Sequence, residues 1–421
     1  MRRVAWALLL IFAFTIPWEY SLNLGEPFGH VARIAGILVL LAAIPAVLQN
    51  GRVRTPGPIQ WLVLLFFLWM CASYFWSIVP DATLDKMRGF FQELMIVWLV
   101  WEFAERPEDV SSLMKAYVAG AWVLALLTLG SLVSASTAAD QIRFVAEGQD
   151  ANDLARYLDM GLPMAALLFA CERGRIARIL AGGYLPLGVI AVLATASREG
   201  FVAALIGLSG CGLLLYRRHQ RLVVGALILL PVLAFGLSLI VPHGTVERLA
   251  TIPEELNRGD LNQRWNIWDA GWQAFVRAPI AGTGAGSFVS GAGLNPVDTA
   301  HNTALSILAD GGLVALFLAS AIVVFSMRAL FQMRGLLQLA LATALLGWMT
   351  TSLVATVEEN RSTWLLIGVI AAAGRMSLED PQAIKRCFGG YGGGTSVPGH
   401  GSQASGKAGA GAIVAGGARC P

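Results

Sequence analysis

Apolar stretches separated by short polar segments follow one another along most of the chain. A helix needs roughly 17–25 apolar residues to cross the hydrocarbon core of a bilayer, with some allowance for short or tilted spans. About twelve stretches meet this requirement: 4–18, 30–48, 59–78, 89–104, 113–134, 153–171, 178–195, 200–216, 222–241, 302–325, 335–356 and 362–374. The pattern predicts an all-α integral membrane protein with about twelve transmembrane helices.

Composition excludes an ordinary water-soluble protein. Hydrophobic residues make up 56% of the 421 residues and charged residues only 14%, whereas soluble chains carry about 25% charged residues. The net charge of +3 is too balanced to predict nucleic acid as a partner. The five cysteines include no C-x-x-C spacing, so neither a disulfide framework nor a zinc site is expected. No small-residue cleavage signal follows the first apolar stretch, which is therefore read as an uncleaved span.

The distribution of basic residues predicts the orientation, because Lys and Arg accumulate in short loops that stay in the cytoplasm. With the N-terminus inside, the inner segments collect most of them: Arg2, Arg3, Arg52, Arg54, Arg173, Arg175, Arg178, Arg217, Arg218, Arg221, Arg328, Arg334, Arg375, Lys385 and Arg386. The opposite short loops carry mixed charge, as in residues 81–88 and 358–361. Span count and charge therefore both predict two cytoplasmic termini.

One outer loop, about 242–300 between the ninth and tenth predicted spans, is too long for a simple connector. Its segment 260–263 has the form of a helix capping box. Aromatic residues then recur at spacings of three and four: Trp265, Trp268, Trp272 and Phe275. This spacing predicts an amphipathic helix ended by Pro279. Such a helix fits either the lipid interface, which favours Trp, or a lid over a site.

The expected domain organisation is a polytopic transmembrane domain over residues 1–378 and a Gly/Ala/Ser-rich, disordered cytoplasmic tail over 379–421. Within the tail, residues 401–407 match most of a phosphate-binding loop. Ala408 takes the place of the Ser or Thr that contacts magnesium, and no strand precedes the segment. Nucleotide binding is therefore not expected.

Charged groups near membrane depth are costly and mark candidate sites. Arg198 lies in the tight connection between the seventh and eighth predicted spans, and Arg264 opens the Trp-rich helix, where a cation gains nothing from the helix dipole. The turn at Gly282, Thr283 and Gly284 presents backbone N–H groups that an anion can approach. The alternatives are a snorkelling arginine, a solvated loop arginine and a flexible return to the membrane.

His301 is the most informative histidine of the five, because it combines a predicted helix start with nearby arginines. Asp298 or Thr299 can cap the helix of the tenth span. The positive end of that helix favours a neutral imidazole, which can accept a proton near pH 7.

Four sequence pieces, in this order, resemble the O-antigen ligase and polymerase superfamily of bacterial membrane enzymes over about residues 140–315. They are Arg143 with Asp150-Ala151-Asn152-Asp153-Leu154-Ala155, then Ser197-Arg198-Glu199-Gly200, then Arg264 and Trp268 with Gly282-Thr283-Gly284, and finally His301-Asn302 with Asp310-Gly311-Gly312. Two positions depart from the pattern: Ala151, where the family usually has proline, and Asp310, where glutamate is commoner.

The resemblance implies transfer of a glycan from undecaprenyl diphosphate to an acceptor hydroxyl, such as lipid A-core, at the periplasmic face of the bacterial inner membrane. It implies inversion at the anomeric carbon without metal or cofactor. The catalytic residues would be His301, Arg198 and Arg264, and the substrate-binding residues Arg143, Asn152, Asn302, Gly282 and Gly284. Arginine forks match phosphate geometry, and fixed positive charge stabilises a departing diphosphate.

Two kinds of alternative stay open at this point. A polymerase, which adds the glycan to another lipid-linked repeat, and an O-oligosaccharyltransferase, which adds it to a protein hydroxyl, use the same donor. A polytopic transporter is an alternative of a different class, although transporters often show two similar halves. The long outer loop in the second half of this chain has no counterpart in the first half.

Overall fold

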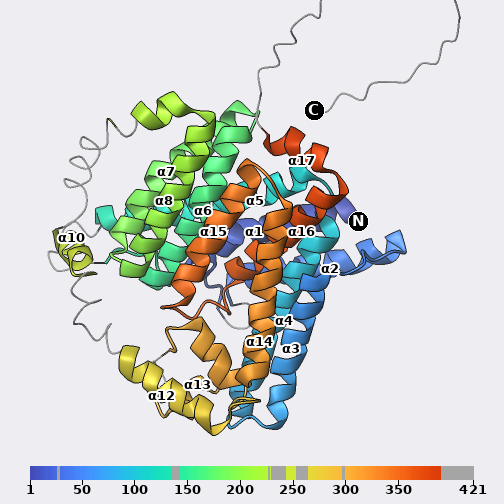
Figure 1. Cartoon of the computed structure of the whole chain (residues 1–421), viewed down its shortest axis with the longest axis vertical. Helices are drawn as coiled ribbons and strands as arrows, with labels where there is room; N and C mark the ends of the chain where they lie inside the picture. The colour runs from blue at the N-terminus through green and yellow to red at the C-terminus, as the bar shows by residue number, and fades with distance from the viewer. Residues whose placement is uncertain are drawn as a thin grey trace, which may run out of the picture. The chain divides into compact units, whose positions relative to one another are not determined.

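The computed structural model describes residues 1–25, 29–134, 143–225, 228, 243–252, 264–295 and 299–389. The helices in these ranges are α1 (Arg2–Thr15), η1 (Ile16–Ser21), α2 (Val31–Asn50), α3 (Pro58–Ala72), η2 (Ser73–Phe75), α4 (Pro80–Phe103), α5 (Pro107–Ser134), α6 (Ala151–Cys171), α7 (Arg175–Ala194), α8 (Arg198–Arg218), α10 (His243–Ala250), α12 (Arg264–Arg277), α13 (Phe288–Ala292), α14 (Thr303–Gln332), α15 (Leu336–Ser352), α16 (Arg361–Glu379) and α17 (Pro381–Phe388) (Figure 1). The part of the chain that is described contains helices and no β-strand, which confirms the all-α prediction.

Eight of the described helical segments are long and apolar enough to cross a membrane. They are Arg2–Ser21, Val31–Asn50, Pro58–Phe75, Pro107–Ser134, Ala151–Cys171, Arg175–Ala194, Arg198–Arg218 and Thr303–Gln332. Three further predicted spans fall in helices with weaker membrane character: α4 and α16 carry several charges, and α15 has 17 residues. The ninth predicted span, 222–241, lies largely outside the described residues, so the count of twelve stays a prediction.

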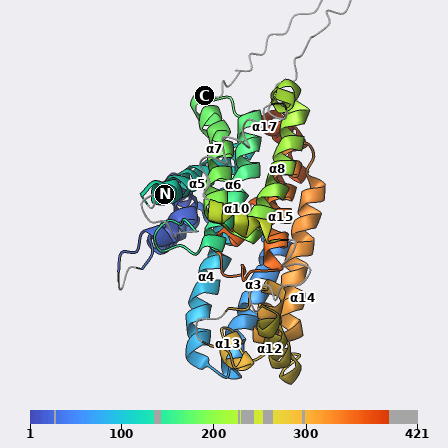
Figure 2. The ribbon, with the colours of Figure 1, turned by 90° about the vertical axis from the view of Figure 1, so that its left-hand side faces the viewer.

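Helix α6 is the centre of one group of helices, because it packs against α5, α7, α8 and α15. Most of its residues are buried, because neighbouring helices cover it on several sides, and the buried set includes the polar residue Asp159. A second group consists of α3, α4, α14 and α16. In Figure 2, α3, α4 and α14 reach the end of the molecule where α12 and α13 lie, and the hydrophobic contact of α12 and α13 with α14 centres on Ala274, Phe288 and Ala309.

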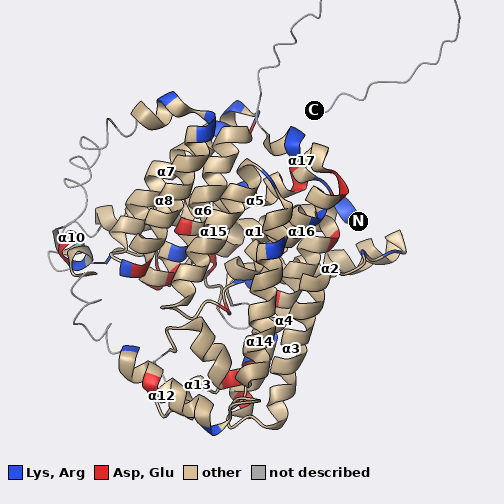
Figure 3. Ribbon diagram, in the orientation of Figure 1, with Lys and Arg blue, Asp and Glu red and all other residues tan. Residues whose placement is uncertain are grey.

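Lys and Arg residues gather around the N-terminus, α17, the start of α7 and the end of α8 (Figure 3). Helix α8, for example, ends in Arg217 and Arg218. Helix α6 also ends there, and Arg173 and Arg175 follow it in the sequence. The basic residues in this region belong to the segments that the sequence predicts to be cytoplasmic.

The long loop and the tail agree with the sequence predictions only in part. The predicted Trp-rich helix is confirmed as α12, which ends at Arg277, two residues before Pro279. The proposed capping box at 260–263 lies outside the described residues. The sequence also predicts disorder from residue 379, but α17 is an ordered helix there. Its residues Ile384 and Phe388 are buried one turn apart, and the Phe388 carbonyl accepts a hydrogen bond from Cys171 at 3.2 Å.

Candidate active site

A cavity of about 520 Å³ lies where α6, α8 and α14 begin and α15 ends, beside α10 and α12. Its charged lining residues, among those described, are Arg143, Asp150, Arg198, Glu199, Arg248 and Arg264. Asn152 and His301 also line it. The cavity therefore brings together five of the eight predicted site residues, which are separated by up to 158 positions in the sequence: Arg143, Asn152, Arg198, Arg264 and His301.

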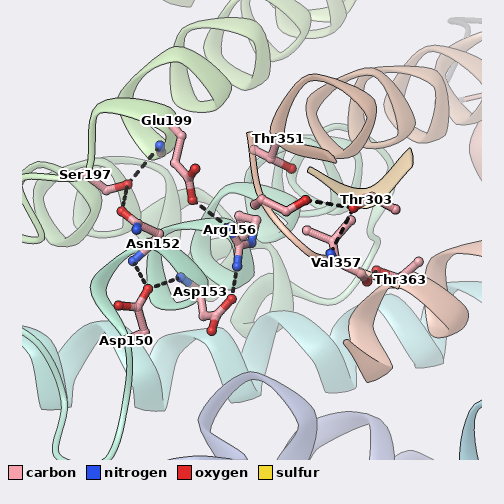
Figure 4. Close-up of polar contacts among 12 residues, drawn as sticks. Asp150, Asn152, Asp153, Arg156, Ser197, Glu199, Thr303, Thr351, Val357 and Thr363 are labelled. Atoms are coloured by element: carbon pink, nitrogen blue, oxygen red, sulfur yellow. Dashed lines mark hydrogen bonds and ion pairs between the residues drawn. The ribbon is translucent and has the colours of Figure 1, made fainter. Parts of the chain in front are cut away.

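The start of α6 positions Arg143 and Asn152. The Asp150 carboxylate caps the helix by accepting hydrogen bonds from the backbone N–H groups of Asn152 (2.8 Å) and Asp153 (3.3 Å). Figure 4 shows Asn152 turned toward Ser197, whose hydroxyl donates to Asn152 Oδ1 at 2.8 Å. The same oxygen accepts from the Arg143 guanidinium at 3.0 Å. Asn152 therefore joins the beginnings of α6 and α8 and orients Arg143.

The α7–α8 connection holds Arg198 at the cavity through a tight backbone. Ala196 has φ 50°, a strained value for a residue other than glycine. Ser197 then caps α8 by accepting from the Gly200 N–H at 3.1 Å. A side chain at Gly200 would place its Cβ 2.3 Å from the Cβ of Ala155, so α8 begins in close contact with α6. The glycine is needed here because the two helices approach so closely.

Arg198 connects α8 to α10. Its guanidinium donates to the Thr251 hydroxyl at 2.6 Å and to the Arg248 carbonyl at 3.3 Å. Arg248 donates in turn to the Ala196 carbonyl at 3.1 Å. These contacts fix one guanidinium from α8 and one from α10 at the same wall of the cavity.

Glu199 forms an ion pair with Arg264, the first residue of α12. Its carboxylate lies 2.6 Å from the Arg156 guanidinium and 3.6 Å from that of Arg264, and its side chain is only 5% exposed. Arg156 also forms an ion pair with Asp153 (Figure 4). Burial lowers the pKa of the Arg264 guanidinium below its ordinary value, and Glu199 opposes this shift. Glu199 therefore offsets part of the cost of burying the Arg264 guanidinium and orients it toward the cavity.

His301 reaches the cavity from the residue before the cap of α14, where its backbone has φ 45°. The expected cap at Thr299 is wrong, and Asp298 lies outside the described residues. The cap is Asn302, whose Oδ1 accepts from the Leu305 N–H at 2.9 Å. A cap at residue 302 leaves the imidazole outside the first helical turn.

The predicted substrate-binding residue Asn302 has a supporting position instead. It does not line the cavity, and its amide nitrogen donates to the Leu353 carbonyl at 3.1 Å. The next residue, Thr303, donates its hydroxyl to the Ala355 carbonyl at 2.7 Å and accepts from the Val357 N–H at 3.0 Å. These contacts tie the backbone beside His301 to the segment that connects α15 and α16.

Gly282 and Gly284 are not at the cavity. The turn Gly282–Gly286 packs against Asp310–Gly312 of α14, and we call these two segments together the glycine clamp. The N–H of Gly284 donates to the Asp310 carbonyl at 2.9 Å, and that of Gly286 donates to the Asp310 carboxylate at 2.6 Å. A Cβ on Gly282 would lie 2.3 Å from the Asp310 carbonyl oxygen. The N–H groups that the sequence offers to an anion are used inside the fold.

The charged residues at or beside the cavity that are not among the predicted site residues include Arg156, Glu199 and Arg248. Arg156 lies inside the predicted span 153–171, and a charge at such depth is itself a signal of a site. Glu199 is adjacent to a candidate arginine, but its contacts with Arg156 and Arg264 span 43 and 65 positions. Arg248 belongs to a short helix in the long loop, and nothing in the sequence around it distinguishes it from a solvated loop arginine.

Comparison with known proteins gives one family. Residues 184–320 match the family described as O-antigen ligase. The matched range contains Arg198, Arg248, Arg264 and His301, whereas Arg143 and Asn152 precede it. A search of curated proteins gives no match.

Proposed function

We propose, from the match of residues 184–320 to the O-antigen ligase family, that this chain moves a glycan from undecaprenyl diphosphate to an acceptor hydroxyl. The acceptor in an O-antigen ligase reaction of this kind is lipid A-core or a similar glycan. The proposed transfer needs no metal. The family match favours this reaction over transport, because it covers the part of the chain that supplies most of the cavity.

One observation carries the proposal: four guanidinium groups and one imidazole line the same cavity. Arg143, Arg198, Arg248 and Arg264 outnumber the two lining carboxylates, Asp150 and Glu199. The excess of positive charge suits a diphosphate, and the planar guanidinium can bind two phosphate oxygens at once. Charge that is already fixed in place stabilises the negative charge that develops on the leaving diphosphate.

In the proposed reaction, His301 accepts the proton of the acceptor hydroxyl as its oxygen attacks the anomeric carbon of the donor sugar. A new glycosidic C–O bond forms while the C–O bond to diphosphate breaks, and undecaprenyl diphosphate leaves with the bonding electron pair. Attack from the face opposite the diphosphate inverts the anomeric centre. Arg198 and Arg264 hold the diphosphate, and Arg143 contacts phosphate or sugar.

We place the reaction at the periplasmic face of a bacterial inner membrane. Helices α6 and α8 begin at the cavity and end near the basic segments, so the cavity lies at the end opposite to the predicted cytoplasmic side. A cysteine introduced at the exposed position Gln273, in a chain whose own cysteines are replaced, tests this placement. An impermeant reagent should label it from the periplasm, and labelling only from the cytoplasm would overturn the topology.

The donor chemistry is shared by ligases, polymerases and O-oligosaccharyltransferases, which differ in the acceptor. Proteoliposomes containing the full chain and a lipid-linked oligosaccharide should be offered lipid A-core, a second lipid-linked repeat and a protein acceptor in parallel. Mass spectrometry then identifies the product that gains the glycan. Modification of lipid A-core supports the ligase assignment, whereas elongation of the lipid-linked repeat would make the protein a polymerase.

A further inference from the structure

A second cavity, of about 180 Å³, lies between the first turns of α4 and the start of α16. Glu93 and Phe90 of α4, Tyr20 of η1 and Arg361 of α16 form its inner wall, and Lys86 and Glu359 lie nearer the surface. Its volume is close to that of about six water molecules, which is enough for one monosaccharide ring.

Buried charged groups build the inner wall of this cavity. The Arg361 guanidinium forms an ion pair with Glu19, which is fully buried, and donates to Gln92 Oε1 at 2.6 Å. Glu93 is only 3% exposed, and its Oε2 accepts no hydrogen bond from any residue that the structure describes. A buried carboxylate oxygen without a donor is costly, so the cavity offers a strong acceptor to a ligand that carries hydrogen-bond donors.

The charges of this cavity define the ligand further. Lys86 pairs with Glu359, and Asp85 pairs with Arg88 at 2.7 Å. Because Arg361 is paired with Glu19, Glu93 is the lining residue whose oxygen still lacks a hydrogen-bond partner. Sugar hydroxyls supply donors, and the buried ring of Phe90 suits the apolar face of a pyranose. A uronic acid would instead place a carboxylate, which carries no hydrogen-bond donor, inside a cavity whose cations are already paired with Glu19 and Glu359. Among the described residues, no group of three or more His, Cys, Asp or Glu side chains is placed to hold a metal ion.

The second cavity is close to the catalytic cavity along one connector. Leu353 and Val354, at the end of α15, line the catalytic cavity, and Glu359 lines the second one. Val354 and Glu359 are five positions apart, which limits their Cα separation to about 18 Å. Asn302 and Thr303 hold the connector to the backbone next to His301. The lining residues of the two cavities therefore come within a distance that a glycan of a few sugar units can span.

We propose that the second cavity is a subsite for one uncharged sugar ring of the glycan substrate, with the Glu93 carboxylate as its principal hydrogen-bond acceptor. This inference rests on the proposed glycan transfer. The ring belongs either to the acceptor or to the donor glycan, and the two sources differ in which Michaelis constant depends on Glu93.

The first test measures binding without turnover. Saturation-transfer NMR on the purified full chain uses the methyl glycosides of glucose, galactose and N-acetylglucosamine as probes, with methyl glucuronide as the charged comparison. We expect binding of at least one neutral glycoside and weaker binding of the glucuronide. Glu93→Leu removes both carboxyl oxygens while filling their space, and Glu93→Gln keeps the shape and replaces one acceptor oxygen with an amide group that only donates. Both should weaken binding, Glu93→Leu by at least about tenfold.

Two controls separate this subsite from the catalytic cavity. Asp81→Asn makes the same change from acid to amide as Glu93→Gln, at an exposed position in the first turn of α4 away from the second cavity, and should bind the glycosides as the wild type does. Arg264→Ala alters the catalytic cavity and should also leave glycoside binding intact. A glycoside signal that is lost in Arg264→Ala and kept in Glu93→Leu would overturn the proposal.

The second test uses transfer kinetics in proteoliposomes. Glu93→Leu should raise the KM of one glycan substrate at least about tenfold and leave kcat at saturation within about twofold of wild type. A raised acceptor KM assigns the ring to the acceptor, and a raised donor KM assigns it to the donor. A fall in kcat with both constants unchanged would overturn the subsite. Glycoside binding without any transfer by the wild type would instead contradict the proposed function and leave the sugar-binding cavity standing.

Discussion

The catalytic cavity and the glycine clamp contain the same kinds of sequence signal but use them in opposite ways. At the cavity, guanidinium groups from α8, α10 and α12 point toward a common space, and each is oriented by contacts at its edge. In the clamp, the N–H groups of Gly284 and Gly286 already donate to Asp310. The difference shows that a glycine-rich turn is available to a ligand only when no other part of the fold satisfies its donors.

The clamp also explains the kink in α14. Gly312 has φ 68° within that helix, and a Cβ there would lie 2.2 Å from the Ile280 carbonyl oxygen. The Leu313 N–H donates to the Pro279 carbonyl at 2.9 Å instead of to its own helix. The segment that follows α12 therefore inserts against α14, and it fixes α12, which carries Arg264, relative to α14, which follows His301.

The largest effect is expected at His301. His301→Ala should lower turnover by roughly 10²–10⁴-fold because the acceptor hydroxyl loses its base, while donor still binds. The loss of turnover at acid pH that a protonated imidazole causes should be absent from the variant. His219→Ala, at the opposite end of α8, is the matched control and should transfer as the wild type does. Loss of donor binding in step with turnover would instead make His301 a diphosphate ligand.

The next effect concerns the arginines of the cavity. Arg198→Ala and Arg264→Ala should each lower transfer by roughly 10²–10³-fold, the usual loss when one group that stabilises developing charge is removed. The Lys variants should also be severely impaired, because an ammonium keeps the charge but not the bidentate fork. Arg277→Ala, on the same helix as Arg264 but away from the cavity, serves as the control. Transfer by Arg264→Ala within about twofold of wild type would remove Arg264 from the diphosphate site.

A smaller effect is expected at Glu199, which balances Arg156 and Arg264. Glu199→Gln leaves more uncompensated positive charge in the cavity, so undecaprenyl diphosphate should bind more tightly and leave more slowly. Steady-state turnover should fall by roughly tenfold, which corresponds to about 1.4 kcal/mol. Product-release kinetics and titration with undecaprenyl diphosphate measure the two quantities. Weaker binding of undecaprenyl diphosphate would show that Glu199 mainly maintains the shape of the site.

The smallest effect on chemistry is expected in the clamp. Gly284 has φ 105°, and a Cβ there would lie 2.4 Å from the Ser77 hydroxyl oxygen, so Gly284→Ala should lower the melting temperature. Gly293→Ala, at φ 68° with no atom within 4 Å of the added Cβ, carries only the backbone strain and should lower it less. Turnover per folded molecule of Gly284→Ala should stay within about threefold of wild type. If the Gly284→Ala protein is stable but fails to bind donor, the turn is part of the donor-binding site after all.

Patterns within single segments were readable from the sequence. Hydrophobic runs located the eight membrane-compatible segments, and the aromatic spacing located α12. The order of short motifs also predicted that Arg198, Arg264 and His301 act together, and the structure brings all three to one cavity.

Contacts between distant segments were not readable in the same way. Nothing in the local pattern of α6 shows that Arg156 meets Glu199, or that the Asp310 carboxylate takes the Gly286 N–H. Both contacts depend on how helices pack, and a single sequence carries no signal for that packing. The predicted position of the α14 cap was wrong for a related reason. Thr299, Asn302 and Thr303 are all residue types suited to a cap, and only the folded backbone selects Asn302.

The most direct test of the account is a single-turnover measurement in proteoliposomes preloaded with lipid-linked donor. After acceptor is added, undecaprenyl diphosphate and glycosylated acceptor are quantified together for wild type, His301→Ala and Gly293→Ala. The account predicts that wild type and Gly293→Ala form one glycosidic bond for each undecaprenyl diphosphate released, whereas His301→Ala retains bound donor and forms almost none of either product. Release by His301→Ala at the wild-type rate, or no release by wild type from bound donor, would contradict the assignment of this cavity to glycan transfer.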